Sequence, residues 1–120
     1  METIVVVDDD KTFGELLTTV LRLDGYRPVV LTAPEEIVPT VREEDPALVL
    51  MDVHIHNEDT LGALQELKDD EALQRIPVIM TSGTDHARQC VNAGADAFVL
   101  KPFLPSEMMA KIADLIGGDE

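Results

Sequence analysis

The sequence predicts an α/β protein in which helices cover both faces of a parallel β-sheet. Five short apolar runs alternate along the chain with five stretches of helical periodicity. Unbroken apolar runs of three to five residues, as found here, are typical of strands buried on both faces. Regular alternation of such strands with helices is typical of a doubly wound sheet in a three-layer sandwich.

The five predicted strands are short and rich in Val, Ile and Leu. The first run, Ile4-Val5-Val6-Val7, stops at three aspartates. Pro77 opens the fourth strand, where a missing N–H is tolerated. The five strands are predicted at residues 4–7, 29–31, 47–51, 77–80 and 97–100.

Helices are predicted between the strands. Apolar residues at i, i+3, i+4, i+7 and i+8 mark a helix over residues 13–21, with Asp10 as its N-cap and Gly25 beyond its end. Thr32 and Glu35 form a capping-box pattern for a second helix, which Pro39 should kink or shorten. The remaining helical patterns lie within residues 61–67, 87–91 and 108–116.

Length and charge restrict the class of protein. The chain has 120 residues, which fits a single domain over residues 1–120. It carries 24 acidic and 9 basic residues, a net charge of −15, which argues against direct binding to a nucleic acid backbone. No apolar segment is long enough to span a membrane, and the N-terminus lacks a signal-peptide pattern. We therefore expect a cytoplasmic protein without membrane association.

Chemically reactive side chains follow the predicted strands. Asp8 and Asp9 follow the first strand, Asp52 the third, Ser82 the fourth and Lys101 the fifth. Doubly wound sheets bind ligands outside the carboxyl ends of their strands. We therefore expect these five side chains to meet in one crevice.

A group of neighbouring carboxylates needs a cation, because the negative charges otherwise repel one another. Mg²⁺ binds through one or two carboxylates and keeps several waters, which leaves room for a phosphate oxygen. Lys101 would pair with a carboxylate in the empty site and with phosphate in the filled one. Such a site suits phosphoryl transfer to a carboxylate, and Asp52 is the best nucleophile because it stands alone at a central strand end.

Four motifs, in this order and spacing, resemble the receiver domain of two-component response regulators along essentially the whole chain. They are Val7-Asp8-Asp9-Asp10, Leu50-Met51-Asp52-Val53-His54, Pro77-Val78-Ile79-Met80-Thr81-Ser82-Gly83 and Ala97-Phe98-Val99-Leu100-Lys101-Pro102-Phe103. The resemblance implies a flavodoxin-like doubly wound (βα)5 three-layer sandwich. Its five parallel strands would have the order 2-1-3-4-5.

The resemblance also implies a role for each acidic residue. Asp52 looks like the phosphoacceptor, which takes a phosphoryl group from a histidine kinase or a small phosphodonor. Asp8 and Asp9 resemble the acidic pair that holds Mg²⁺ or Mn²⁺ together with Asp52. His54 would supply its backbone carbonyl to the metal.

Further residues match family residues that lie next to the phosphate or change conformation when it is present. Ser82 matches the switch hydroxyl and Gly83 the small residue beside the phosphate. Lys101 matches the phosphate-binding lysine, joined to Pro102 by a cis peptide in the family. Phe98 stands where the family has its switch aromatic, although a core role for this residue is an open alternative.

The loop after Asp52 departs from the family pattern. His56 replaces a usual Pro and Thr60 a usual Gly, so the conformation of the loop should differ. His54 and His56 also form an H-x-H pair, but with no third ligand evident we expect solvated loop residues rather than a metal site.

The predicted function is a signalling switch that catalyses only its own phosphorylation and dephosphorylation. Its partners would be a sensor histidine kinase or phosphotransfer protein and a downstream protein or fused output domain. The family uses the face of the last two helices and last strand for output or for a homodimer, so Met108 and Met109 are expected at a partner surface.

Three alternatives are open. A degenerate receiver would bind partners without phosphorylation. An aspartyl-phosphate hydrolase would need a second Asp where this chain has His54, and a flavodoxin-like cofactor carrier would need a phosphate loop where this chain has three aspartates. Whether the chain acts alone or belongs to a longer protein is also open.

Overall fold

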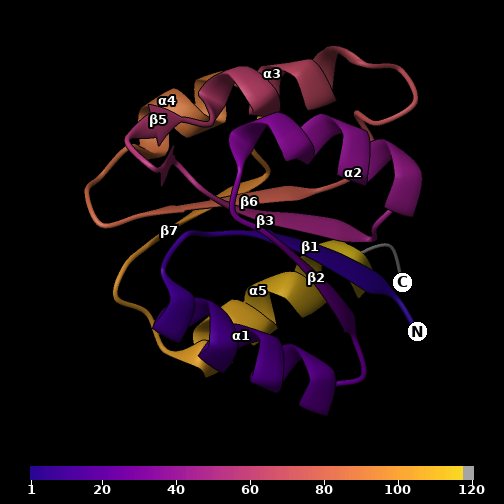
Figure 1. Cartoon of the computed structure of the whole chain (residues 1–120), viewed down its shortest axis with the longest axis vertical. Helices are drawn as coiled ribbons and strands as arrows, with labels where there is room; N and C mark the ends of the chain where they lie inside the picture. Colours follow the sequence, from indigo (N-terminus) through magenta and orange to yellow (C-terminus); the bar gives the residue numbers. More distant parts are fainter. Residues whose placement is uncertain (118–120) are drawn as a thin grey trace.

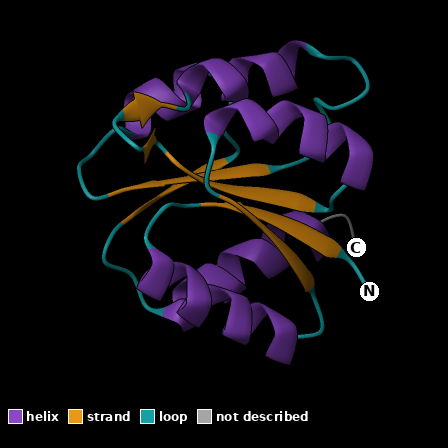
Figure 2. Ribbon diagram, in the orientation of Figure 1, coloured by secondary structure: helices purple, strands orange, loops and turns teal. Residues whose placement is uncertain are grey.

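A five-stranded parallel sheet forms the centre of the computed structural model, which describes residues 1–117 (Figures 1 and 2). The strand order is β2-β1-β3-β6-β7, which is the predicted order 2-1-3-4-5 with the strands renumbered. The strands are β1 (Thr3–Val7), β2 (Arg27–Leu31), β3 (Leu48–Asp52), β6 (Val78–Ser82) and β7 (Ala97–Leu100). The last three residues of the predicted domain, 118–120, lie outside the described residues.

Helices cover both faces of the sheet, as predicted (Figure 1). One face carries α1 (Lys11–Leu23) and α5 (Pro105–Gly117), and the other carries α2 (Ile37–Glu44), α3 (Leu61–Asp69) and α4 (Ala87–Asn92). The buried side chains accordingly form two apolar clusters, one on each side of the sheet. In the described part of the chain, every helix is too short or too polar to cross a membrane.

The capping predictions have mixed outcomes. The Asp10 side chain accepts a hydrogen bond from the Phe13 N–H at 3.1 Å, and α1 ends just before Gly25, whose φ is 89°. The predicted Thr32 cap is wrong. A 3₁₀ turn, η1 (Pro34–Glu36), precedes α2, so that Pro39 falls in the first turn of the helix, where an N–H has no intrahelical partner anyway. Pro39 therefore shortens the predicted helix rather than kinking it.

Met108 and Met109 differ from the surface role expected for them. Met108 is fully buried in the cluster beneath α1 and α5, and Met109 packs against the same cluster. The apolar stripe of α5 contains both methionines, and this stripe faces the sheet. Met108 is therefore a core residue and not part of a partner surface.

A small antiparallel hairpin follows β3, in the loop where the sequence departs from the family pattern. Its strands are β4 (His54–Ile55) and β5 (Glu58–Asp59), with His54 opposite Asp59 and Ile55 opposite Glu58. The two loop residues, His56 and Asn57, have φ angles of 50° and 65°. Two positive φ angles are what a tight two-residue hairpin loop requires, and Asn adopts them more readily than most residues.

Thr60 fastens the base of this hairpin to the end of β3. Its side chain is buried, and its hydroxyl lies 2.7 Å from the Asp52 carbonyl oxygen and 3.2 Å from that of Val53. The Thr60 N–H also donates to the Val53 carbonyl at 2.8 Å. A glycine at this position would lack the hydroxyl. The substitution therefore adds a bond that holds the backbone of Asp52.

We expect Thr60→Val to lower the free energy of unfolding by about 1–3 kcal/mol, because the isosteric side chain leaves a buried carbonyl without its donor. Urea denaturation measures the change. Thr12→Val on the exposed surface of α1 is the matched control and should change stability little. Equal effects of the two substitutions would show that the Thr60 hydroxyl does not fasten the hairpin.

Candidate functional site

The ammonium group of Lys101 bridges two carboxylates at the carboxyl end of the sheet. Lys101 Nζ lies 3.0 Å from Asp8 Oδ2 and 2.8 Å from Asp52 Oδ2. Asp8 directly follows β1, Asp52 is the last residue of β3, and Lys101 directly follows β7. The ends of three parallel strands thus bring together three residues that are far apart in the sequence, as expected for a doubly wound sheet.

These three side chains lie mostly out of contact with water. The exposed fractions are 4% for Asp8, 12% for Asp52 and 19% for Lys101. Burial raises the pKa of the Asp8 carboxyl above its usual value, and this effect outweighs the hydrogen bonds from Asp10 and Lys101 that lower it.

For the pKa of Lys101, the hydrogen bonds and nearby charges outweigh burial. Burial by itself would lower the pKa of the ammonium group, but the bonds to Asp52 and Asp8 and their negative charges raise the pKa above its usual value. Lys101 therefore stays protonated at neutral pH. The ion pairs keep a cation next to both carboxylates.

Each bridged carboxylate is also held by a backbone N–H through its second oxygen. Asp8 Oδ1 accepts a hydrogen bond from the Asp10 N–H at 2.9 Å, and Asp52 Oδ1 accepts one from the His54 N–H at 3.1 Å. With both oxygens engaged, each carboxylate has a fixed orientation. The Asp52 side chain is thus already ordered at the strand end, so a ligand that binds there would not have to immobilise it.

Asp9 lies at the edge of the site, on the side of the hairpin. Its Oδ2 accepts a hydrogen bond from the His56 N–H at 2.9 Å and lies 3.6 Å from the His56 ring nitrogen Nδ1. Among the described residues, Asp9 makes no hydrogen bond to Asp8, Asp52 or Lys101. The loop that departs from the family pattern therefore binds one of the predicted metal ligands.

Ser82 is buried at the end of β6, but its hydroxyl is directed toward the next loop. The Thr84 N–H donates to Ser82 Oγ at 3.2 Å, and Thr84 Oγ1 lies 2.9 Å from His86 Nε2. His86 Nδ1 is in turn 2.9 Å from the side-chain oxygen of Gln89 on α4. The Ser82 hydroxyl is thus joined to the start of α4 and, within residues 1–117, makes no hydrogen bond to the side chain of Asp52 or Lys101. The Ser82 carbonyl accepts a hydrogen bond from the Lys101 backbone N–H at 2.8 Å.

The remaining predicted residues have clear positions around the crevice. Gly83 is exposed, and a Cβ added to it would meet nothing within 4 Å. The Lys101–Pro102 peptide bond is cis. Phe98 lies on β7 opposite Met80 and is half-buried against the apolar cluster beneath α2, α3 and α4.

The oxygen atoms at this strand end fit a hard divalent cation. Within residues 1–117, no three His, Cys, Asp or Glu side chains are arranged to enclose a metal ion. Mg²⁺ does not need such an enclosure, because it binds through one or two carboxylates and keeps water in its other positions. Asp8 and Asp52 already share one cation, Lys101, and the His54–His56 pair gains no third side-chain ligand in the described structure.

Sequence reasoning missed several contacts of these residues. Lys101 Nζ lies 4.6 Å from the centre of the Phe13 ring, and Phe13 in turn packs edge-to-face on Phe103 at 5.2 Å. The rings of His54 and His86 also meet, at 5.2 Å. Only the helical stripe signalled Phe13, and that pattern predicts burial rather than a contact with the lysine.

The sequence matches a known protein family. The family model for the response regulator receiver domain matches residues 4–113. The DNA-binding response regulator MtrA of Mycolicibacterium smegmatis is 34% identical over 114 residues, which are 92% of this chain and 49% of the relative. The chain thus spans about half the length of this relative.

Solved structures agree with the family match. A putative response regulator from Chloroflexus aurantiacus has a TM-score of 0.89 and 26% identity, over 97% of this chain and 98% of the other. The receiver domain of a sensor histidine kinase from Pseudomonas aeruginosa, described with a magnesium ion coordinated in the active site cleft, has a TM-score of 0.86. It is 24% identical over 97% of this chain and 98% of the other, so this likeness concerns the fold.

One assignment follows from the sheet topology, from the three residues at the strand ends and from the match over residues 4–113. The chain belongs to the response regulator receiver domain family and is the receiver domain of a two-component response regulator.

Proposed function

We propose that this receiver domain, formed by residues 1–120, is a switch controlled by phosphorylation of Asp52. The donor would be a histidine kinase, a phosphotransfer protein or a small phosphodonor in the cytoplasm, where ATP supplies phosphoryl groups. The observation that carries the proposal is the Lys101 ammonium group shared by Asp8 and Asp52 at the strand ends. A lysine that holds two carboxylates together is also positioned to hold a phosphoryl group on one of them.

The transfer uses Asp52 as the nucleophile. A carboxylate oxygen of Asp52 forms a bond to phosphorus while the bond from phosphorus to the donor's imidazole nitrogen breaks, and the imidazole departs with that electron pair. Asp52 is suited to this role because Lys101 and the His54 N–H fix its two oxygens. The domain would catalyse only this transfer and the later hydrolysis, in which water attacks phosphorus, the bond from phosphorus to the Asp52 oxygen breaks, and inorganic phosphate leaves.

Mg²⁺, or Mn²⁺ in its place, would be held by Asp8, Asp9 and Asp52 with the carbonyl of His54. The ion would neutralise negative charge that gathers as a phosphoryl group approaches the carboxylates. Asp8 is prepared for this because its carboxylate already faces Asp52 across a cation. The His56 N–H engages only Oδ2 of Asp9, so the hairpin would orient this carboxylate while its other oxygen takes part in metal binding.

Phosphorylation would then change the contacts of Ser82 and Lys101. The new phosphate oxygens attract the Lys101 ammonium and offer an acceptor to the Ser82 hydroxyl, which now contacts Thr84. Movement of Ser82 would disturb the chain of contacts that ends at Gln89 on α4. Phe98, half-buried on the neighbouring strand β7, would turn inward as this loop moves.

The face of α4, β7 and α5 is the proposed output surface. Val91 on α4 is 59% exposed, Leu100 at the end of β7 is 49% exposed, and Leu104 before α5 is 63% exposed. Exposed apolar side chains on these adjoining segments favour contact with a downstream protein, a fused output domain or a second copy of the chain. A degenerate receiver would use the same surface without phosphorylation, and the next experiment distinguishes the two.

Incubation with acetyl phosphate and Mg²⁺ should add one phosphoryl group to the wild-type protein, because Asp52 is a fixed and partly exposed nucleophile. Intact mass spectrometry measures the gain. Asp52→Asn and a sample with EDTA should show none. A wild-type protein that binds Mg²⁺ and gains no mass with either acetyl phosphate or a phosphorylated histidine kinase would support the degenerate receiver instead.

Lys101→Met should lower the free energy of unfolding by about 1.5–3 kcal/mol without Mg²⁺, because Asp8 and Asp52 then lose their shared cation. Added Mg²⁺ should restore more stability to this variant than to the wild type, since the metal no longer competes with the ammonium group. Urea denaturation with and without Mg²⁺ measures both effects. Lys111→Met, exposed on α5, is the control. Equal gains from Mg²⁺ in all three proteins would contradict a shared carboxylate site.

Phe98→Trp should give a fluorescent reporter of the switch, because the chain has no other tryptophan. Acetyl phosphate and Mg²⁺ should shift its emission to shorter wavelength as the ring moves into the apolar cluster. Tyr26→Trp, next to the start of β2, should keep its emission unchanged. A phosphorylated protein in which neither emission changes would show that Phe98 is simply a core residue.

A further inference from the structure

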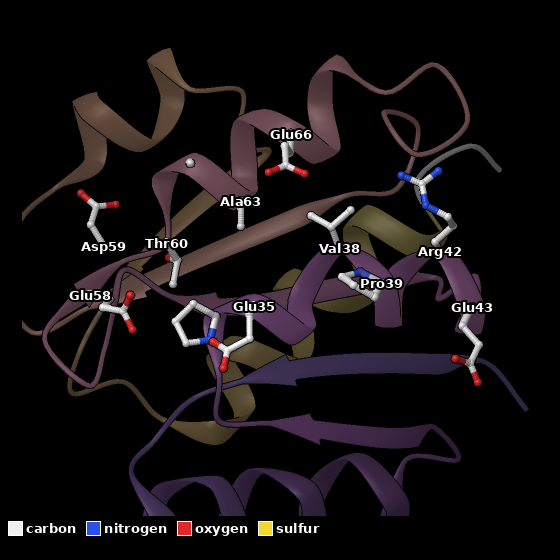
Figure 3. Close-up of a pocket in the computed structure, with 12 residues that line it drawn as sticks. Glu35, Val38, Pro39, Arg42, Glu43, Glu58, Asp59, Thr60, Ala63 and Glu66 are labelled. Carbon is white, nitrogen blue, oxygen red and sulfur yellow. The ribbon is translucent and has the colours of Figure 1, made fainter.

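A groove between α2 and α3 lies on the sheet face opposite α1 and α5 (Figure 3). Its volume is about 900 Å³, and the β4–β5 hairpin closes one end of it. None of its residues belongs to the predicted phosphorylation site, and it does not include α4, β7 or α5. The lining residues are Pro34, Glu35, Val38, Pro39, Arg42, Glu43, Glu58, Asp59, Thr60, Gly62, Ala63 and Glu66.

The floor of the groove is apolar and exists because α3 presents small residues there. Val38 and Pro39 on α2 lie opposite Ala63 on α3 (Figure 3). Val38 and Ala63 are only partly buried. A Cβ added to Gly62 would meet nothing within 4 Å, so this part of α3 borders open space. The volume of the groove leaves room for an apolar side chain on this floor.

The rim of the groove is strongly acidic. Its four glutamates are Glu35 from the turn η1, Glu43 from α2, Glu58 from the hairpin and Glu66 from α3. Within residues 1–117, none of these four glutamates forms an ion pair. The one basic residue of the rim, Arg42, is paired with Asp70 at 3.0 Å. The groove thus has an uncompensated negative rim around an apolar floor.

We propose that this groove binds a basic amphipathic helix of a partner protein. An apolar side chain of that helix would enter the space between Val38 and Ala63, while Lys or Arg residues on either side would reach the glutamates of the rim. The helices α2 and α3 have 8 and 9 residues, or about 12–14 Å, which matches two to three turns of a bound helix.

Charge distinguishes this occupant from others. The acidic rim repels nucleic acid phosphates and anionic lipid headgroups, and a second copy of this chain would bring the same net charge of −15. A cationic helix alone matches both the floor and the rim. The proposal concerns the unphosphorylated protein and goes beyond the proposed switch, so each can fail without the other.

The probe is a fluorescein-labelled synthetic helix of about 14 residues, with leucines at i, i+3, i+4 and i+7 and lysines elsewhere. Fluorescence anisotropy without phosphodonor measures affinity, and amide NMR shifts locate the binding site. A peptide of the same composition, with its leucines scattered around the helix, is the control ligand. We expect the amphipathic peptide to bind more tightly and to shift the amides of Val38, Gly62 and Ala63.

Three variants of the groove test its floor and its rim separately. Gly62→Leu should weaken binding about tenfold or more, because the leucine fills the space meant for the ligand's side chain. Gly62→Ala, which leaves the space open, should have little effect. The double change Glu43→Gln and Glu66→Gln should weaken binding about fivefold to tenfold through loss of two charge pairs.

The matched charge control is the double change Glu15→Gln and Asp114→Asn, two exposed residues on α1 and α5. It removes the same charge from the opposite face and should leave affinity within about twofold. Equal weakening by both double variants, equal binding of the scattered peptide, or amide shifts away from α2 and α3 would overturn the proposal. A dimer of the chain alone that Gly62→Leu dissociates would identify the occupant as a second copy and also overturn it.

Discussion

The Lys101 ammonium group, held between the carboxylates of Asp8 and Asp52, is the interaction on which the rest of the site depends. Two carboxylates that close together repel each other unless a cation lies between them. The lysine supplies that cation, and the parallel sheet supplies the placement, because all three residues stand at carboxyl ends of strands. The pair of carboxylates that needs a cation is also the pair suited to a metal ion and a phosphoryl group.

A second partly buried lysine provides a contrast that supports the proposed switch. Lys68 Nζ donates to the carbonyl oxygens of Gln74 and Ile76 at 3.2 and 2.8 Å and to Asp96 Oδ2 at 2.8 Å. Asp96 Oδ2 also accepts the Val78 N–H, at the start of β6. That lysine holds fixed backbone at the opposite end of the strands. Among residues 1–117, the Lys101 ammonium group instead donates hydrogen bonds only to the carboxylates of Asp8 and Asp52 and lies near the Phe13 ring. The proposed phosphate could therefore attract this group without loss of any bond from it to the backbone.

Much of this arrangement could be predicted from the sequence, because a strand buried on both faces leaves an unbroken apolar run and the residue after it must lie at one edge of the sheet. That logic placed Asp8, Asp52 and Lys101 together. It could not place Asp9 or Ser82, because the side-chain direction of each depends on a partner outside its own strand, the His56 N–H and Thr84. The β4–β5 hairpin was missed because its two positive φ angles fall at His56 and Asn57, and no glycine in the loop indicates a turn.

The β4–β5 hairpin contacts both Asp52 and Asp9, which lie at or just beyond the ends of different strands. Its first strand begins at His54, whose N–H holds Asp52, its loop holds Asp9 through His56, and its base is tied to β3 by Thr60. The same segment closes one end of the acidic groove. Asp52 and Thr60, which lines the groove, are therefore joined both by this short segment and by the hydrogen bond from the Thr60 hydroxyl to the Asp52 carbonyl.

Mapping of the phosphorylated residue tests the central claim most directly. Borohydride reduces an aspartyl phosphate to homoserine, so reduction of the acetyl phosphate-treated protein followed by peptide sequencing by mass spectrometry identifies the acceptor. The account predicts homoserine at position 52 and nowhere else. Homoserine at Asp8 or Asp9, with Asp52 unchanged, would contradict it.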